Sequence, residues 1–235
     1  MTESQTLLLL DIIYKKYQAW LDGHNFICTK GCSACCTQSV TVTSLEAEDI
    51  LTHLRQENQI DLLNLIKHTP FSQNPRLITT NRLARYCLDQ EEPPDENLEW
   101  NFSPCIFLSN KCCRIYEFRP FACRSFVSTV PCSQDGGAHV PPWIITLNTV
   151  IMQVIEHIDV NGKWGNMTDI LKSLTSDDDN REPAFSETEP LPGFLIPEDE
   201  KKQIFPLIKD LVETEADHST FGALSGLNLT DLPLE

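Results

Sequence analysis

Eight of the ten cysteines in this 235-residue chain fall into two short segments that lie about 70 residues apart. The first segment, CTKGCSACC, and the second, PCIFLSNKCCRIYEFRPFACRSF, contain Cys28, Cys32, Cys35 and Cys36, and Cys105, Cys112, Cys113 and Cys123. In a reducing compartment this density is typical of metal ligands or redox groups, because disulfides do not persist there. We therefore expect the two segments to fold together around a metal centre.

The spacing within the first segment narrows the kind of site. Cys32-Ser-Ala-Cys35 is a CxxC unit, which suits tetrahedral zinc or an iron–sulfur cluster. With Cys28 added, the spacing is also similar to the cluster-binding triplet of radical S-adenosylmethionine enzymes. Ala34 stands where those enzymes usually have an aromatic residue, and the chain lacks the alternating β–α pattern of their partial barrel.

Two pairs of adjacent cysteines, Cys35-Cys36 and Cys112-Cys113, restrict the geometry further. Neighbouring side chains diverge, so one member of each pair is expected to serve a second metal, a supporting role or the core. Free cysteine is a small apolar residue that is often buried, and we expect core positions for Cys87 and Cys112. For Cys132 we also expect core packing, with completion of a second metal site as the alternative.

Basic side chains accompany the second segment. It carries Lys111, Arg114, Arg119 and Arg124 against the single acidic residue Glu117, in a chain of net charge −16. Thiolates are the metal-binding form of cysteine, and nearby cations offset the negative charge that several of them bring. The alternative is that these residues are ordinary surface groups.

The overall charge and hydropathy limit the partners. A net charge of −16 disfavours binding to nucleic acid, which needs clustered Lys and Arg, and it disfavours anionic membranes. The most apolar stretch, LLLLDII, is too short to span a bilayer, and MTESQ lacks the basic start of a signal peptide. We expect a cytoplasmic protein whose partner is a metal ion, with no nucleic acid and no membrane; an exported, disulfide-linked domain is the alternative.

The pattern of apolar residues predicts a mainly α fold, a single irregular helical domain with cysteine-rich loops that converge on the metal site. TSLE, at Thr43 to Glu46, is a capping box, Val160 to Gly165 is expected to form a turn, and Pro206 is expected to kink the last helix. We expect helices over 6–21, 45–56, 59–67, 81–88, 143–158, 166–174 and 198–216, with a short strand at 39–43. The predicted organisation is a cysteine-cluster domain over 1–174, an acidic Pro-containing linker over 175–197 and a C-terminal helix with a frayed tail over 198–235.

The two cysteine segments resemble the bacterial cysteine-cluster family of zinc- or iron-chelating proteins, which has a CxxCxxCC signature. The resemblance extends from about Cys28 to Phe126, and its most specific part is C-R-I-Y-x-x-R-P-x-x-C-R, at 113–124. A related arrangement occurs in flagellin lysine N-methylases. The resemblance implies that Arg119 and Arg124 support the centre, which would be zinc, iron or an iron–sulfur cluster. It implies the metal ligands Cys28, Cys32, Cys35, Cys36, Cys105, Cys113 and Cys123.

Three functions fit these observations. The first is a metal-binding protein for storage, delivery or structure, and the second is an iron–sulfur enzyme that modifies proteins, related to lysine N-methylases. The third is a thiol redox sensor. The chain has no Ser–His–Asp pattern, phosphate-binding glycine loop or HExxH motif, so no catalytic residue is identified. An ordered concave pocket beside the cysteines would favour an enzyme, and burial of the cysteines under helices would favour a structural site.

Overall fold

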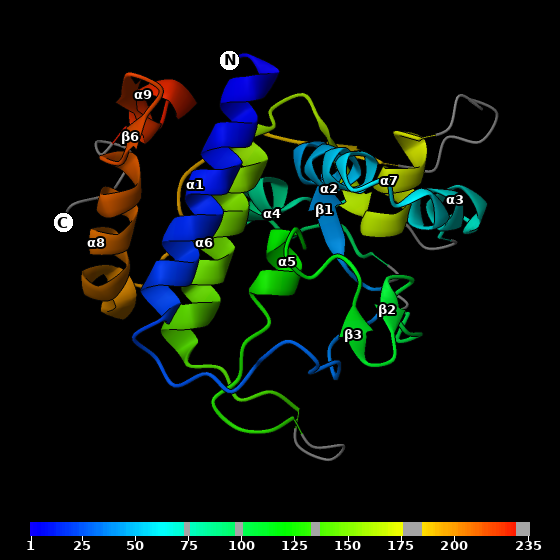
Figure 1. The fold of residues 1–235 in the computed structure, drawn as a ribbon. Coiled ribbons are helices and arrows are strands. Elements are labelled where there is room, and N and C mark those ends of the chain that lie inside the picture. The colour runs from blue at the N-terminus through cyan, green and yellow to red at the C-terminus, as the bar shows by residue number, and fades with distance from the viewer. Residues whose placement is uncertain (73–75, 97–100, 133–136, 176–184, 229–235) are drawn as a thin grey trace.

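A computed structural model describes residues 1–72, 76–96, 101–132, 137–175 and 185–228 of the chain. Within these ranges helices make up most of the regular structure, and the three sheets are small (Figure 1). The predicted mainly α fold is therefore confirmed. None of the helices in these ranges combines the length and apolarity that crossing a membrane requires.

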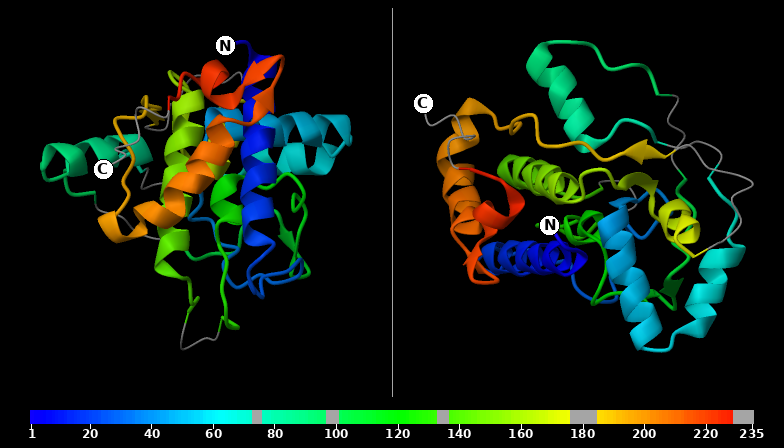
Figure 2. Two further views of the ribbon diagram at one scale, coloured as in Figure 1. Left: turned by 90° about the vertical axis from the view of Figure 1, so that its left-hand side faces the viewer. Right: turned by 90° about the horizontal axis from the view of Figure 1, so that it is seen from above.

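One hydrophobic core lies between the long helices. α1 (Glu3–Leu21) packs against α6 (Pro142–Ile158), and α8 (Lys201–Val212) covers both (Figures 1 and 2). α1 starts earlier than expected because Thr2 and Gln5 form a capping box. Pro142 occupies the first turn of α6, where its missing N–H has no cost.

The C-terminal part of the chain is more ordered than the predicted frayed tail. α8 follows a short 3-10 helix (Glu198–Glu200) and contains Pro206. Beyond it, β6 (Glu215–Ala216) and β7 (Ser219–Thr220) form a hairpin that leads into α9 (Phe221–Ser225). Phe221 is fully buried in the first core, which explains why these residues are held. The predicted end of the tail, 229–235, lies outside the described residues.

A second core lies under α2 (Ser44–Gln56), α3 (Ile60–His68) and α7 (Met167–Ser173). The TSLE capping box forms as predicted at the start of α2, and Asn166 caps α7. A three-stranded antiparallel sheet borders this core, in the order β1 (Thr41–Thr43), β4 (Lys163–Asn166) and β5 (Ser186–Glu187). β4 includes part of the segment 160–165 that was expected to be a turn, because Trp164 and Gly165 pair with β1.

The predicted linker over 175–197 lies only partly within the described residues. Positions 176–184 lie outside the described residues, whereas Ser186 pairs with Trp164 and Thr188 is buried. α4 (Thr80–Asp89) packs against α6. The domain boundaries themselves stay a prediction.

The short helix α5 (Phe121–Arg124) connects the two cores (Figure 1). Phe121 is buried in the first core and contacts the ring of Tyr17 edge-on, with the centroids 4.8 Å apart. The next two residues, Ala122 and Cys123, pack against the second core. α5 therefore places a cysteine at the junction of the two cores.

Candidate metal centre

Backbone hydrogen bonds hold the two cysteine segments together. The Cys105 N–H donates to the Cys36 carbonyl at 3.0 Å, and the Gln38 N–H donates to the Ser103 carbonyl at 3.0 Å. Beyond the backbone, the Lys30 ammonium pairs with the Glu117 carboxylate at 2.9 Å. These contacts bring together residues that are far apart in the sequence.

A tight hairpin determines which member of the second cysteine pair faces inward. β2 (Leu108–Ser109) pairs with β3 (Cys112–Cys113) across Asn110 and Lys111, which have φ values of 50° and 63°. Positive φ at both positions is typical of a two-residue hairpin turn. Successive strand residues face opposite sides, so Cys113 packs toward the second core while Cys112 is exposed.

The position of Cys123 depends on a buried carboxylate. Glu46, the last residue of the capping box, accepts the Phe121 N–H at 2.7 Å and the Tyr14 hydroxyl at 3.0 Å. Pro120 precedes α5 with an extended backbone, so the Phe121 N–H needs a partner outside the helix. In the sequence, the capping box is the only signal for Glu46, and no pattern marks Tyr14 as a supporting residue.

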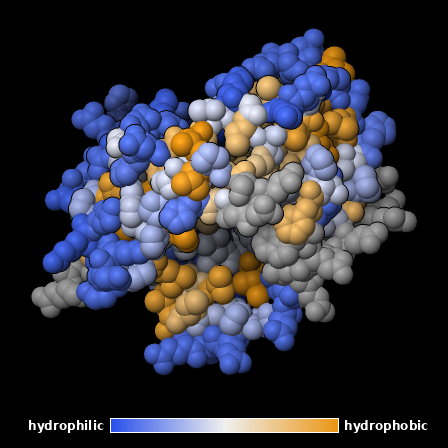
Figure 3. Space-filling view, turned by 90° about the horizontal axis from the view of Figure 1, so that it is seen from below, coloured by the Kyte–Doolittle hydropathy of each residue, from blue (hydrophilic) through white to orange (hydrophobic). Residues whose placement is uncertain are grey.

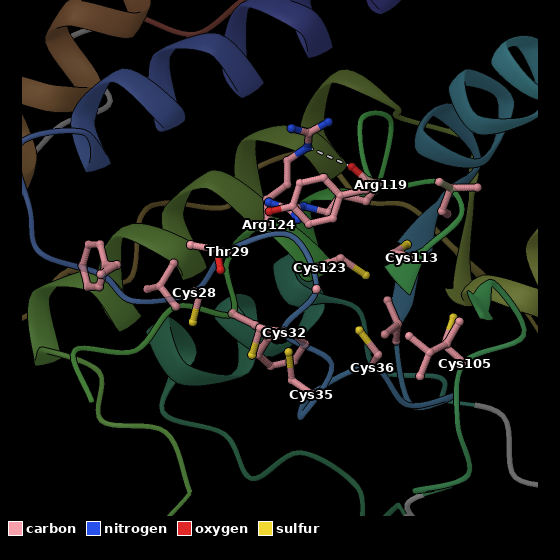
Figure 4. Close-up of a pocket in the computed structure, with 18 of the residues that line it drawn as sticks. Cys28, Thr29, Cys32, Cys35, Cys36, Cys105, Cys113, Arg119, Cys123 and Arg124 are labelled. Atoms are coloured by element: carbon pink, nitrogen blue, oxygen red, sulfur yellow. Dashed lines mark hydrogen bonds between the residues drawn. The ribbon is translucent and has the colours of Figure 1, made fainter. Parts of the chain in front are cut away.

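The structure places every cysteine that was predicted to bind metal around one cavity of about 320 Å³. Arg119 and Arg124 also line it, and Leu21, Phe26 and Val127 form an apolar part of its wall. On the face seen from below, apolar side chains border a hollow in the surface (Figure 3). The cysteines at the cavity are Cys28, Cys32, Cys35, Cys36, Cys105, Cys113 and Cys123 (Figure 4).

The thiols line one cavity, but they are not arranged as the ligands of a metal ion. Among the described residues, no group of three or more His, Cys, Asp or Glu side chains has an arrangement that would hold a metal ion. All ten cysteines lie in the described ranges and are free thiols. Their role as ligands therefore stays a prediction, and the geometry shown is that of a cysteine-lined cavity.

Burial keeps most of these thiols protonated. It raises the pKa of Cys105 to about 11, and it raises the pKa of Cys113 and, with the neighbouring thiols adding to it, that of Cys123. A hydrogen bond between Cys35 and Cys36 raises the pKa of Cys35 and lowers the pKa of Cys36. Converting this set to thiolates needs added positive charge, which a metal ion supplies.

Backbone N–H groups of other residues donate to three of the sulfur atoms. The Phe107 N–H donates to Cys105 and the Ile115 N–H donates to Cys113, each two residues further along the chain. Cys28 receives the Ser128 N–H. Such donors stabilise thiolates around a metal, so the soft sulfur donors and their partners fit zinc or iron.

The two arginines that were predicted to support the centre have different environments. The Arg119 guanidinium stacks on Tyr116, with its Cζ 3.8 Å from the ring centroid, and has a buried Nε without a hydrogen-bond partner. Its positive charge partly offsets the rise in the pKa values of Cys35, Cys113 and Cys123 that burial and the Cys35–Cys36 hydrogen bond cause. Arg124 instead donates to the Arg119 carbonyl at 2.8 Å (Figure 4) and to the Glu117 carbonyl at 2.8 Å. Arg124 thus braces the backbone of the motif, and Arg119 is the cation beside the sulfurs.

The remaining cysteines correct one expectation. Cys87 and Cys112 are exposed, so their expected core positions were wrong. Cys87 lies on α4, whose buried face consists of Asn81 and Ala84. Cys132 is partly buried, and its charge acts on Cys28. His24 lines the cavity with its Nδ1 at 3.1 Å from the Trp20 carbonyl.

These features define a helical protein with a cysteine-lined cavity between two cores. Residues 27–142 match the model of the CxxCxxCC family, which is described as a putative zinc- or iron-chelating domain. The chain therefore carries a domain of this family, and the resemblance in its cysteine pattern is confirmed. The family description supports metal binding by this chain. No curated protein and no solved structure matches the chain.

Proposed function

We propose that this chain is a cytoplasmic metal-binding protein that holds zinc or iron, the latter alone or in an iron–sulfur cluster, through thiolates of both cysteine segments. The observation that carries the proposal is the lining of one cavity of about 320 Å³ by seven cysteines from the two segments. Zinc and iron–sulfur sites both use such thiolates. Cysteines bind metal only while they are reduced, and the cytoplasm keeps thiols reduced.

The cavity is larger than a single ion needs. Structural zinc sites are closed by four protein ligands, whereas a site that reacts or exchanges keeps an open position. A volume of about 320 Å³ lies at the lower end of the range for small-molecule sites. We therefore propose a centre that remains reachable from solvent, as storage or delivery of a metal requires.

A second candidate function is an iron–sulfur-dependent enzyme that modifies proteins, related to lysine N-methylases. The apolar part of the cavity wall favours it, because Leu21, Phe26 and Val127 are of no use to a metal ion but suit the aliphatic part of a substrate side chain. In this function, Arg119 would tune the charge of the cluster.

The test is to purify the protein without oxygen and to measure metal, acid-labile sulfide and the visible spectrum per chain. Stoichiometric zinc without colour supports a chelating site, and iron with sulfide and a brown colour supports a cluster and the enzyme candidate. A chain that contains no metal, and that takes up neither zinc nor iron after reduction, contradicts both functions.

A further inference from the structure

The sulfur atoms at the cavity fall into two sets by position. In the close-up, the side chains of Cys28, Cys32 and Cys35 lie on one side of the cavity, and those of Cys36, Cys105, Cys113 and Cys123 lie on the other (Figure 4). Electrostatic effects agree with this grouping, since Cys105 and Cys113 act on both Cys36 and Cys123, whereas Cys32 and Cys132 act on Cys28. Cys35 acts on both Cys28 and Cys123, so it lies where the two groups meet. We call the four-cysteine group the inner set.

Cys132 lies beside the other group. The Ile27 N–H donates to the Ser128 carbonyl at 2.9 Å, and the Ser128 N–H donates to the Cys28 sulfur, so the segment from Ser128 to Cys132 lies along the start of the first cysteine segment. Ser128 is fully buried, and its hydroxyl donates to the Val130 carbonyl at 2.7 Å. Cys132 does not line the cavity, but its electrostatic effect on Cys28 ranks between those of Cys32 and Cys35, which makes it the fourth thiol of this group. We call Cys28, Cys32, Cys35 and Cys132 the outer set.

The two sets differ in exposure. The members of the inner set are all partly buried, and three of them pack against the second core. In the outer set, Cys32 and Cys35 are exposed and lie in a loop whose backbone contacts are mostly short-range turns. Gly31, with φ of +98°, gives this loop a backbone conformation that other residues rarely adopt. The outer set is therefore the less enclosed of the two.

We propose that the two sets bind two metal ions of the zinc or ferrous class, one held by the inner set and one by the outer set, with Cys132 as a ligand of the outer ion. This inference rests on the proposed function. It accounts for the adjacent pair Cys35-Cys36, because the two side chains serve different ions and their hydrogen bond marks where the sites meet. It also accounts for the number of cysteines, since four thiolates complete a tetrahedral site and the two remaining cysteines, Cys87 and Cys112, are exposed.

Unequal exposure predicts unequal exchange. The inner ion is enclosed by packed side chains and by the Phe107 and Ile115 N–H donors, so it leaves slowly. The outer ion faces solvent and has only the Ser128 N–H as an identified donor outside its own loop. The outer site is then the one that accepts or delivers metal, while the inner site holds the two segments together.

The experiment is an anaerobic titration of the reduced, metal-free full chain with Co²⁺, whose visible spectrum reports thiolate ligation, together with release kinetics in excess chelator. The wild type is expected to bind two Co²⁺ per chain and to release them in two phases. Cys132→Ser is expected to keep one slowly released ion and to lose or weaken the other by more than tenfold. The matched control Cys112→Ser is expected to behave as the wild type.

A further variant separates loss of a ligand from damage to the fold. Cys132→His replaces the thiolate by another cobalt ligand, and it is expected to regain the second ion with an altered spectrum. One Co²⁺ per chain in the wild type, or two unchanged ions in Cys132→Ser, would overturn the two-site inference while leaving the proposed function intact. No Co²⁺ bound by the wild type would overturn both.

Discussion

The Glu46 carboxylate accepts the Phe121 N–H at 2.7 Å and thereby joins the start of α2 to the start of α5. The same carboxylate accepts the Tyr14 hydroxyl and the Thr43 N–H, both at 3.0 Å, so one buried group connects three parts of the fold. Cys123 is two residues beyond Phe121. The position of a candidate metal ligand therefore depends on a capping residue that lies far from it in the sequence.

Replacement of this carboxylate tests the connection. Glu46→Ala is expected to lower the free energy of unfolding by about 2–4 kcal/mol, because buried N–H donors lose their acceptor and the helix loses its cap. It should also weaken metal binding, since α5 loses its anchor. Urea denaturation and a chelator competition measure the two effects. Glu48→Ala, on the same helix and without a hydrogen bond to α5, is the control; equal stability of the two variants would contradict the anchoring role.

The Arg119 guanidinium is expected to favour the thiolates of Cys35, Cys113 and Cys123 by its charge. Arg119→Gln should therefore reduce metal affinity by about 10–100-fold, as is typical when a group that supports metal ligands is lost. Arg114→Gln is the matched control, because Arg114 pairs with Asp61 at 2.5 Å outside the cavity. Equal affinities of the two variants, measured by chelator competition, would show that Arg119 has no electrostatic role.

Metal binding is expected to depend steeply on pH. Burial raises the pKa of Cys105 to about 11, so this thiol is protonated at neutral pH until a metal displaces its proton. Affinity should rise about tenfold per pH unit for each proton displaced, and protons should appear in the solvent on binding. Titrations with zinc at pH 6, 7 and 8 in two buffers of different ionisation enthalpy measure both quantities. An affinity that does not change over this range would contradict thiolate ligation.

A separate pH effect is expected from Asp159, whose pKa is raised by burial from 3.8 to about 6. Its Oδ2 accepts the Ser44 hydroxyl at 2.8 Å and the Leu45 N–H at 3.1 Å. A folded-state pKa above the unfolded one means that the contribution of Asp159 to stability is fully present below pH 4 and is lost as the pH rises through 6.

The Asp159→Asn side chain keeps an oxygen that can accept these two hydrogen bonds, but its amide does not titrate. Relative to the wild type, its free energy of unfolding should therefore increase by about 2–3 kcal/mol between pH 4 and pH 7, as a shift of about two pKa units implies. Urea denaturation across this range measures the difference. The exposed Asp199→Asn serves as the control; a constant difference between Asp159→Asn and the wild type would contradict the assignment.

The sequence predicted the helices where local signals are strong. The capping box at Thr43, Pro142 in the first turn of α6 and Asn166 before α7 each determine a helix start through contacts within a few residues. The predicted frayed tail was wrong over residues 219–228, because Phe221 is buried where α9 packs against α1 and α8, and no local pattern encodes that contact. The same holds for β4, which pairs with β1 and β5, two strands that are separate from it in the sequence.

The cysteines that line the cavity could be predicted from the sequence, whereas most of the residues that hold them in place could not. The motif identified the cysteines at the cavity, because the spacing of cysteines can be read from the sequence alone. The inward orientation of Cys113 and the outward orientation of Cys112 depend on the hairpin turn at Asn110 and Lys111, where neither residue is a glycine. The positions of Cys132 and Glu46 depend on long-range packing, so only the folded chain reveals them.

The most direct test of the central claim compares two neighbouring cysteines. Cys113→Ser and Cys112→Ser change adjacent residues of the same strand, but only Cys113 lines the cavity. The measurement is metal per chain after anaerobic purification, with Cys32→Ser as a third variant from the first segment. The account predicts that Cys113→Ser and Cys32→Ser each lose metal and that Cys112→Ser retains the wild-type content. Equal metal content in all three variants and the wild type would contradict a metal centre shared by the two segments.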